Sequence, residues 1–281
     1  MTVTAEIISI GNEILLGETQ DTNASWLCRS LTRSGFSVSR VQVLPDDFAA
    51  IRDGVRTAME RRPRLLITTG GLGPTDDDLT LSAIAAALGR ALELNGAALI
   101  MIQETYKNLA SRTYVADPAL TASREKMAVL PTEAKPLSNT VGAAPGVLLD
   151  LGSTLLVALP GVPAEMRAIF NDQLSPPGGP LNSIYGTEAH LQCLVIVETQ
   201  DESILSAVLR GVSAACPAVY VKSRATPFGP GVRLRILLST RNPDAVKARL
   251  NLDAAVATLT DELARAGVGI SQSAPVPPVS D

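Results

Sequence analysis

Leu65-Leu66-Ile67-Thr68-Thr69-Gly70-Gly71-Leu72-Gly73-Pro74 is the stretch of this sequence that decides its fold. Its first half is apolar or β-branched throughout, which predicts a short buried strand. Glycines follow at once, and a helix is expected from about Leu79 to Leu88. A strand, a glycine-rich turn and a helix in this order form the unit from which parallel sheets are built.

The same alternation occurs twice before this stretch. Strands are predicted over residues 3–10 and 36–44, each followed by a helix, over 21–35 and around the apolar stripe 48–59. Three such alternations predict an α/β fold, a three-layer, doubly wound, mostly parallel sheet with right-handed crossovers. Ligands of such sheets bind beyond the carboxyl ends of the strands, so the turns after Ile10, Leu44 and Thr69 are expected to hold a site.

The rest of the chain divides at a segment rich in proline and glycine, residues 175–180. Beyond it the pattern changes to strand, helix, strand, strand and helix, which predicts a smaller α+β domain with helices on one face of a sheet. We therefore expect a nucleotide-binding domain over 1–175, a linker over 176–187, a second domain over 188–270 and a disordered tail over 271–281. Before the linker, the expected elements are helices over 97–112, 118–127 and 163–174 and short strands over 147–149 and 154–158.

Composition narrows the class of protein. The chain has 281 residues, of which 46% are apolar and only 3% aromatic, so its core is expected to be aliphatic. The formal net charge of −4 makes nucleic acid an unlikely partner. The start of the chain has no signal-peptide pattern, and no apolar run approaches the ~20 residues of a membrane span. Three scattered cysteines are expected to be free buried thiols, which fits a cytoplasmic protein.

The glycine-rich turn is the first candidate site. Backbone N–H groups of Gly70, Gly71 and Gly73 can approach an anion, and the following helix adds a partial positive charge. No lysine or arginine occurs between Leu65 and Gly89, whereas aspartate occupies 76–78, which suggests a divalent cation such as Mg²⁺. The alternative is a turn whose aspartates merely cap the helix.

Two further turns leave the same expected edge of the sheet. In the first, Glu13 is a candidate base or metal ligand, and Asn12 and Asn23 are candidates for hydrogen bonds to a sugar or base. One of the residues 21–23 is expected only to cap the first helix. In the second, Asp46 faces the expected ligand edge, but capping the next helix is the role that local evidence favours.

A later pair of segments, 138–146 and 159–166, places small residues around glycines and begins a helix at Pro163. Close backbone approach to a ligand and ordinary turn formation both remain open for them. The single histidine, His190, excludes zinc motifs that need two histidines and is expected to have a structural role.

Taken together, Gly11–Gly17, 21–23, Thr69–Asp78, 139–146 and 159–166 resemble the amino-terminal module of the competence/damage-inducible CinA proteins, a relative of molybdopterin-binding domains. The resemblance covers about residues 4–175, and residues 188–268 resemble the KH-type domain that follows in that family. One departure is Asn12, where threonine is common. Another is that the sequence ends at Asp281 without the family's nicotinamide-nucleotide amidase domain, so we expect no amidase activity.

This resemblance implies hydrolysis of ADP-ribose to AMP and ribose 5-phosphate with a divalent metal, Mg²⁺ or else Mn²⁺ or Co²⁺. It implies a catalytic role for Asp78 and, after the second strand, for Asp46. The expected catalytic residues are Asp78, Asp46 and Glu13, with Asp78 and Asp46 on the metal. The residues expected to bind substrate are Gly11, Asn12, Asn23, Gly70, Gly71, Gly73, Thr75, Asn139, Gly142, Gly146, Pro160 and Gly161.

Two other functions stay open: a molybdopterin-binding or adenylyl-transferring protein, and a non-catalytic nucleotide-binding module. The expected partners are a small nucleotide, further copies of the chain in a dimer or trimer, and a separately encoded amidase. No RNA-clamping G-x-x-G loop is evident between Ala189 and Gly269.

Overall fold

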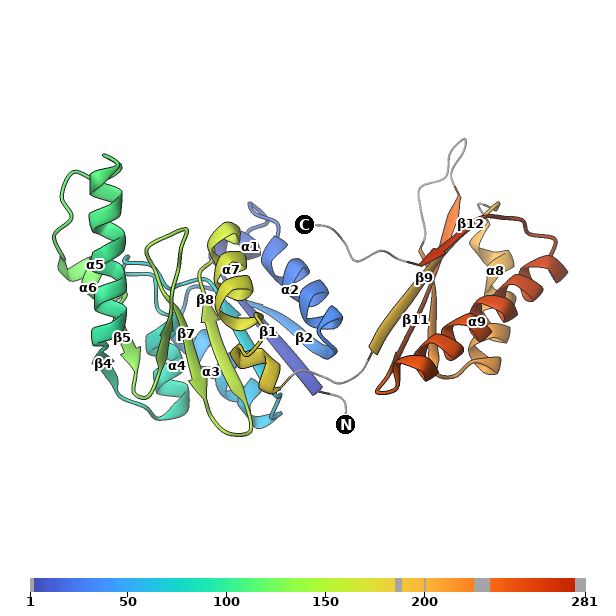
Figure 1. Cartoon of the computed structure of the whole chain (residues 1–281), viewed down its shortest axis with the longest axis horizontal. Helices are drawn as coiled ribbons and strands as arrows, with labels where there is room; N and C mark the ends of the chain where they lie inside the picture. Colours follow the sequence, from blue (N-terminus) through green and yellow to red (C-terminus); the bar gives the residue numbers. More distant parts are fainter. Residues whose placement is uncertain (1–2, 185–188, 200, 225–232, 276–281) are drawn as a thin grey trace. The chain divides into compact units, whose positions relative to one another are not determined.

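The computed structural model describes residues 3–184, 189–199, 201–224 and 233–275. The chain forms two compact units, Met1–Gly186 and Thr187–Asp281, and each has a hydrophobic core of its own (Figure 1). The first unit extends beyond the expected boundary at residue 175. Its extension contains the 3₁₀ helix η2 (Pro180–Ser183), whose Leu181 is fully buried in the core of that unit, so these residues are not a free linker.

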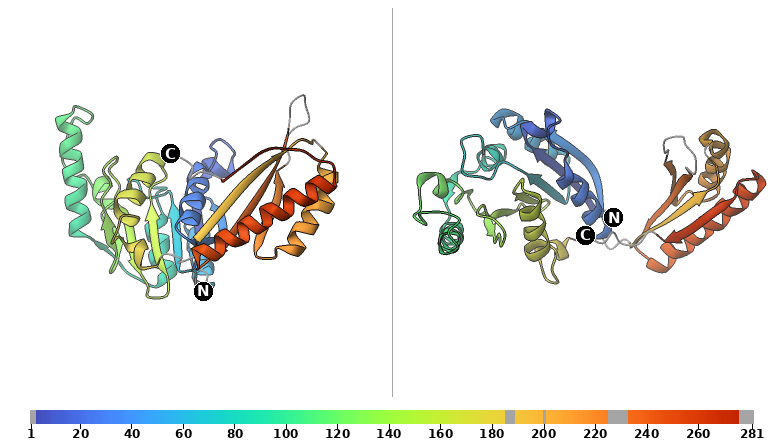
Figure 2. Two further views of the ribbon diagram at one scale, coloured as in Figure 1. Left: turned by 45° about the vertical axis from the view of Figure 1, so that its right-hand side comes forward. Right: turned by 90° about the horizontal axis from the view of Figure 1, so that it is seen from above.

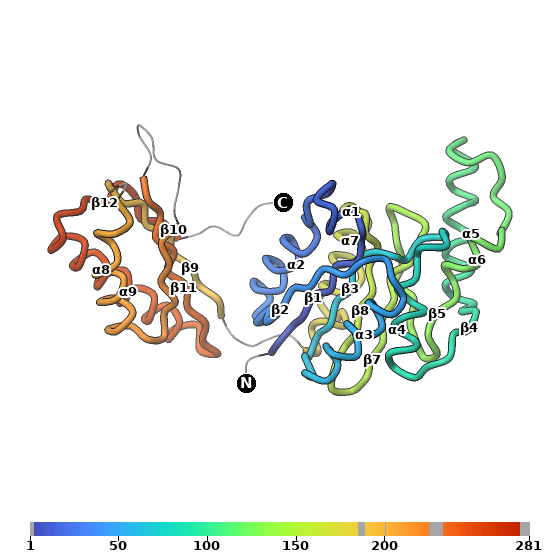
Figure 3. Tube along the Cα trace, turned by 180° about the vertical axis from the view of Figure 1, so that it is seen from behind, coloured from blue at the N-terminus to red at the C-terminus, as the bar shows by residue number. Residues whose placement is uncertain are grey.

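The first unit is built on a six-stranded sheet in the order β2-β1-β3-β8-β7-β6 (Figure 3). β1 (Val3–Ile10), β2 (Phe36–Leu44), β3 (Leu65–Thr69) and β8 (Leu155–Leu159) are parallel. β7 (Gly146–Asp150) runs antiparallel to β8, and β6 (Lys135–Leu137) antiparallel to β7. The predicted mostly parallel sheet is confirmed.

Helices cover both faces of this sheet, as a doubly wound fold requires (Figure 2). On one face lie α2 (Thr22–Arg33), α7 (Pro163–Ile169) and the π-turn η1 (Phe170–Leu174), where the ring of Trp26 meets the ring of Phe170 edge-on. On the other face lie α3 (Phe48–Glu60), α4 (Thr80–Leu88) and α5 (Gly96–Ser111). Apolar residues at helical spacing therefore bury both surfaces of an aliphatic sheet.

Several short elements were not predicted. α1 (Asn12–Leu15) follows β1 directly, and β4 (Leu92–Leu94) pairs antiparallel with β5 (Val129–Pro131). The helix expected over 118–127 is only α6 (Ala122–Lys126). Elements of three or four residues, such as α1, β4 and β5, carry too little periodicity to be recognised from sequence.

The second unit is a four-stranded antiparallel sheet in the order β10-β11-β9-β12. Its strands are β9 (Ala189–Val197), β10 (Val219–Arg224), β11 (Leu234–Asn242) and β12 (Ile270–Pro275), and its helices are α8 (Glu202–Ala215) and α9 (Ala245–Arg265). Residues 271–275 were expected to be disordered, which is wrong. They form β12 because main-chain pairing with β9 requires no apolar side chains, and half of the residues of β12 are polar. Residues 276–281 lie outside the described residues.

Over the described parts of the chain, no helix has the length and apolar character needed to cross a bilayer.

Candidate functional site

The turns that follow the parallel strands enclose one cavity of about 470 Å³ in the first unit. Glu13 comes from the segment after β1, Asp46 from the turn after β2, and Asp78 from the turn after β3. The remaining predicted residues on its wall are Gly11, Gly70, Gly71, Gly73, Pro160 and Gly161. The parallel order of the strands thus brings together residues that are far apart in the sequence.

The glycine-rich turn passes so close to its neighbours that only glycine fits. Gly70 has φ of +102°, and a Cβ there would lie 2.2 Å from the carbonyl oxygen of Ile10. Its N–H donates to the carbonyl oxygen of Leu159 at 3.0 Å, and its carbonyl accepts from Thr80 Oγ1 at 2.8 Å. The turn is therefore held between the ends of β1 and β8, with its backbone at the cavity.

Asp78 closes this turn and does not cap a helix. The N-cap of α4 is Leu79, and no side chain caps it. Instead Asp78 Oδ2 accepts hydrogen bonds from Thr75 N at 2.8 Å and Thr75 Oγ1 at 2.6 Å. The same hydroxyl contacts Asp77, and this hydrogen bond, with the Asp77 backbone amide and nearby Lys126, holds the pKa of Asp77 below its usual value.

The two neighbouring aspartates after β2 have separate roles. Asp47 is the N-cap of α3, and its carboxylate accepts from Ala50 N at 2.8 Å. Asp46, for which capping was the favoured role, instead accepts from Asn12 N through Oδ2 at 2.7 Å. Because Asp47 provides the cap, Asp46 faces the cavity and links the turns after β1 and β2.

Three predicted site residues, Asn12, Asn23 and Thr75, support the wall through hydrogen bonds. Asp21 caps α2, as expected for one of three candidates, and Asn23 donates through Nδ2 to the carbonyl oxygen of Gly161 at 2.7 Å. Asn12 and Thr75 act through the hydrogen bonds described above. Gly146, by contrast, packs in the sheet, where a Cβ would lie 3.0 Å from Ile169 Cγ2.

Asn139 connects this cavity to a second one. With Gly142 it lines a neighbouring cavity of about 330 Å³ beside α5. Its Nδ2 donates to Glu165 Oε2 at 2.6 Å, and Glu165 lines the main cavity. Burial raises the pKa of the Glu165 carboxyl, which the hydrogen bond from Asn139 partly offsets. Glu165 was not among the predicted site residues, because an acid in the first turn of a helix is ordinary in sequence.

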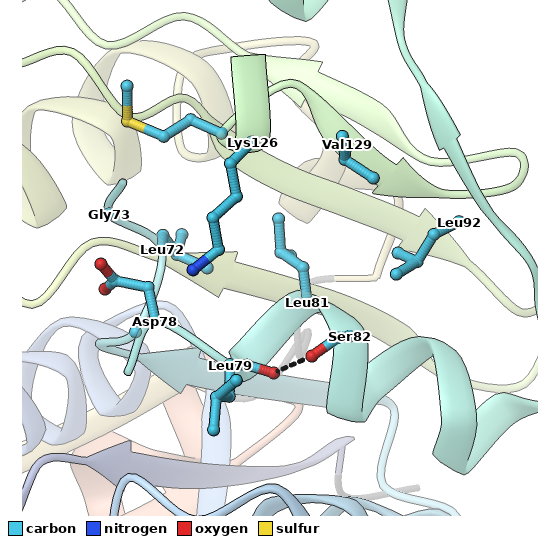
Figure 4. Close-up of a pocket in the computed structure, with 11 residues that line it drawn as sticks. Leu72, Gly73, Asp78, Leu79, Leu81, Ser82, Leu92, Lys126 and Val129 are labelled. Atoms are coloured by element: carbon cyan, nitrogen blue, oxygen red, sulfur yellow. Dashed lines mark hydrogen bonds between the residues drawn. The ribbon is translucent and has the colours of Figure 1, made fainter. Parts of the chain in front are cut away.

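The ammonium group of Lys126, a residue of α6, lies beside the glycine-rich turn. A small adjoining cavity of about 100 Å³ is lined by Asp78, Gly73 and Lys126. Figure 4 shows the Lys126 side chain extending toward the turn that carries Asp78. Its Nζ donates to the carbonyl oxygen of Thr75. Lys126 is distant from residues 65–89 in the sequence, and only the fold brings α6 to the turn.

The carboxylates that line the cavity determine what kind of metal site it can form. Among the described residues, no group of three or more His, Cys, Asp and Glu side chains is arranged to hold a metal ion. Asp46 and Asp78 each use Oδ2 within the turns, and neither Oδ1 accepts a hydrogen bond from a described residue. Mg²⁺ commonly takes one or two carboxylates together with water and substrate phosphates. The arrangement fits a cation that binds jointly with a phosphorylated ligand.

Comparisons with known proteins agree with this fold. The family described as probable molybdopterin binding domain matches residues 6–177. A protein of Aeropyrum pernix is 42% identical over 87% of this chain and 88% of its own, and one of Pyrobaculum arsenaticum is 43% identical over 82% and 83%. The crystal structure of CinA from Thermoplasma acidophilum, described as of unknown function, is 38% identical with a TM-score of 0.55, covering 60% of this chain and 95% of that one.

The family match extends over more than half of the chain and includes residues of every strand of the six-stranded sheet and every residue that lines the cavity. The chain therefore belongs to the molybdopterin-binding domain family, and its first unit is a CinA-like member of that family.

Proposed function

We propose that the main cavity hydrolyses the pyrophosphate bond of ADP-ribose or a related nucleotide, in a reaction that depends on a divalent metal. The observation that supports this most is the shared cavity of Glu13, Asp46, Asp78 and the glycine-rich turn. The amides of Gly71 and Gly73 can donate to a phosphate, and the carboxylates can bind a cation that neutralises it. The two kinds of group together suit a diphosphate that arrives with a cation.

The residues of the chain would divide the substrate between them. Backbone amides of Gly71 and Gly73 would hold a phosphate, supported by Lys126 beside the turn, whereas the N–H of Gly70 already donates to the carbonyl oxygen of Leu159. Leu72, Tyr106 and Met127 form an apolar part of the wall, which suits a base or sugar. Asp46 and Asp78 would hold the cation, which when bound neutralises the diphosphate and lowers the pKa of water.

Release of AMP from ADP-ribose is the direct test. We expect the purified chain to release AMP and ribose 5-phosphate with Mg²⁺, Mn²⁺ or Co²⁺, as identified by mass spectrometry. Asp78→Asn should lower kcat by roughly 100-fold or more, because a carboxylate on the metal is lost. The matched control is Asp47→Asn, which keeps the cap of α3 because asparagine also caps well, and should keep the rate. Absence of product with all three metals would sink the proposal.

A second candidate is binding or adenylyl transfer of molybdopterin. The match of residues 6–177 to the molybdopterin-binding family favours it, and the same turn could hold a pterin phosphate. Equilibrium dialysis with molybdopterin, beside the ADP-ribose assay, separates the two candidates. Tight molybdopterin binding without ADP-ribose turnover would favour the second, and nucleotide binding without turnover of either kind would indicate a non-catalytic module.

A further inference from the structure

Glu165 lies on the wall of the main cavity and has no part in the function proposed so far. It belongs to the first turn of α7, which follows β8. In the sheet β8 lies on one side of β3, whereas β1 and β2, which precede Glu13 and Asp46, lie on the other. The other charged side chains on this wall, among the described residues, are Glu13, Asp46, Asp77 and Asp78. Glu165 is thus a fifth carboxylate at the site, supplied by a separate element.

Its carboxyl group is fixed by the loop of residues 139–144. Asn139 Nδ2 donates to Glu165 Oε2 at 2.6 Å and to the carbonyl oxygen of Ala144 at 2.8 Å. Asn139 Oδ1 accepts from Val141 N at 3.1 Å and Gly142 N at 2.9 Å, so the orientation of the amide is determined. A Cβ on Gly142 would lie 2.1 Å from Glu165 Cδ, which means that the loop closes directly over the carboxyl group.

These contacts occupy only one of the two carboxyl oxygens of Glu165. Glu165 Oε1 accepts no hydrogen bond from a described residue, whereas Oε2 is occupied by Asn139. Glu13 offers no comparable constraint, because it is exposed to solvent on the four-residue helix α1. A general base must lie near the water whose proton it accepts and must be held in a fixed position. Glu165 lines the cavity, and Asn139 fixes its carboxyl group.

We propose that Glu165 is the general base of the hydrolysis proposed above, on which this inference rests, and that Asn139 is its positioning residue. The oxygen of water forms a bond to one phosphorus, the bridging P–O bond breaks, and its electron pair leaves with the departing phosphate. One proton of the water passes to Glu165 Oε1 and then to solvent. The second stays on the new phosphate and ionises there.

The electrostatic setting agrees with this role. Burial raises the pKa of the Glu165 carboxyl, and the hydrogen bond from Asn139 acts in the opposite direction. The loop 138–146 that packs against it has no charged residue, and Arg167 on its own helix lies over the Trp26 ring. A carboxylate whose pKa is raised is a stronger base than an exposed one.

The test compares pH–rate profiles of AMP release from ADP-ribose with saturating metal. Glu165→Gln should lower kcat by roughly 10²- to 10⁴-fold and remove the acidic limb of kcat/KM. Glutamine can still accept the hydrogen bond from Asn139, so the fold should persist, which circular dichroism checks. Asn139→Ala removes a hydrogen bond that lowers the pKa, so the acidic limb should move to higher pH. Glu93→Gln, on the exposed strand β4, is the matched control and should leave the profile unchanged.

The outcomes separate this inference from the proposed function. If the wild type is active and Glu165→Gln keeps both its acidic limb and a kcat within a few fold of wild type, Glu165 is not the base. The proposed hydrolase function would still stand. Loss of the limb in Glu13→Gln but not in Glu165→Gln would assign the base to Glu13. A wild type that releases no AMP with any metal would overturn both.

Discussion

Glu165 and Asp77 are carboxylates on the wall of one cavity, but their surroundings move their pKa values in opposite directions. Glu165 is half-buried beneath an uncharged loop, and burial penalises its ionised form. Asp77 is exposed and accepts a hydrogen bond from Thr75 close to Lys126, which favours its ionised form. Pairs of this kind divide proton-accepting and charge-carrying roles within one site.

The raised pKa of Glu165 makes a prediction about stability. Because the folded state holds this proton more tightly than the unfolded state, the stability tied to it is present below the ordinary pKa of 4.5 and is lost as pH rises through the folded value. Glu165→Gln lacks this loss, so its stability relative to wild type should improve as pH rises above about 4.5. Urea unfolding of both proteins at a series of pH values measures the difference, and parallel curves would contradict it.

At the residue scale, position relative to a strand end was the informative signal. Glu13, Asp46 and Asp78 could be predicted to meet because each follows a parallel strand, and they line one cavity. Lys126 and Glu165 could not, because their proximity depends on how α6 and α7 pack and not on any local pattern. Asn139 contacts Glu165 in the structure, and its predicted role in binding substrate stays a prediction.

At the scale of elements, the N-cap of α3 decides which of two adjacent aspartates is available for chemistry. Asp47 satisfies the backbone N–H of Ala50, and this leaves Asp46 at the cavity. Sequence alone could not choose between them, since both side chains are suitable caps at adjacent positions.

These neighbours should therefore separate stability from activity. Asp47→Ala should lower the free energy of unfolding by about 1 kcal/mol, the usual cost of a lost N-cap, with little change in AMP release per folded molecule. Asp46→Asn should do the reverse, because asparagine can still accept from Asn12 N but binds a cation poorly. Urea titration and the ADP-ribose assay on both variants give the comparison. Equal effects of the two substitutions on both measurements would show that the assignment is wrong.

Elements of five or more residues with a continuous apolar run or a clear helical period were predicted within a few residues, as β1, β2, β3 and α4 show. The elements that were missed are short or partly polar. β4, β5 and β6 have three residues each, and β12 is a half-polar strand that depends on its pairing with β9. Such strands are specified by main-chain partners distant in sequence, so their own composition carries little information.

At the scale of the whole molecule, the chain has separate cores in two units. The first unit packs helices on both faces of a parallel sheet, and the second packs α8 and α9 on an antiparallel one. The change in pattern after residue 180 allowed two domains to be predicted. The boundary was placed too early because a proline- and glycine-rich segment can still pack, as Leu181 does. The KH-type character of the second unit and the oligomeric state stay predictions.

Separate cores imply separate unfolding transitions, and the chain contains its own reporter. Trp26, the single tryptophan, lies in the core of the first unit, so its fluorescence follows that unit alone. Leu259 is fully buried in the core of the second unit, and Leu259→Ala should destabilise that unit by roughly 2–5 kcal/mol. In urea, part of the far-ultraviolet circular dichroism transition should shift to lower concentration while the fluorescence midpoint stays in place. Leu31→Ala, equally buried in the first unit, should shift the fluorescence midpoint. A fluorescence midpoint that moves with Leu259→Ala as far as it does with Leu31→Ala would mean that the two cores unfold as one.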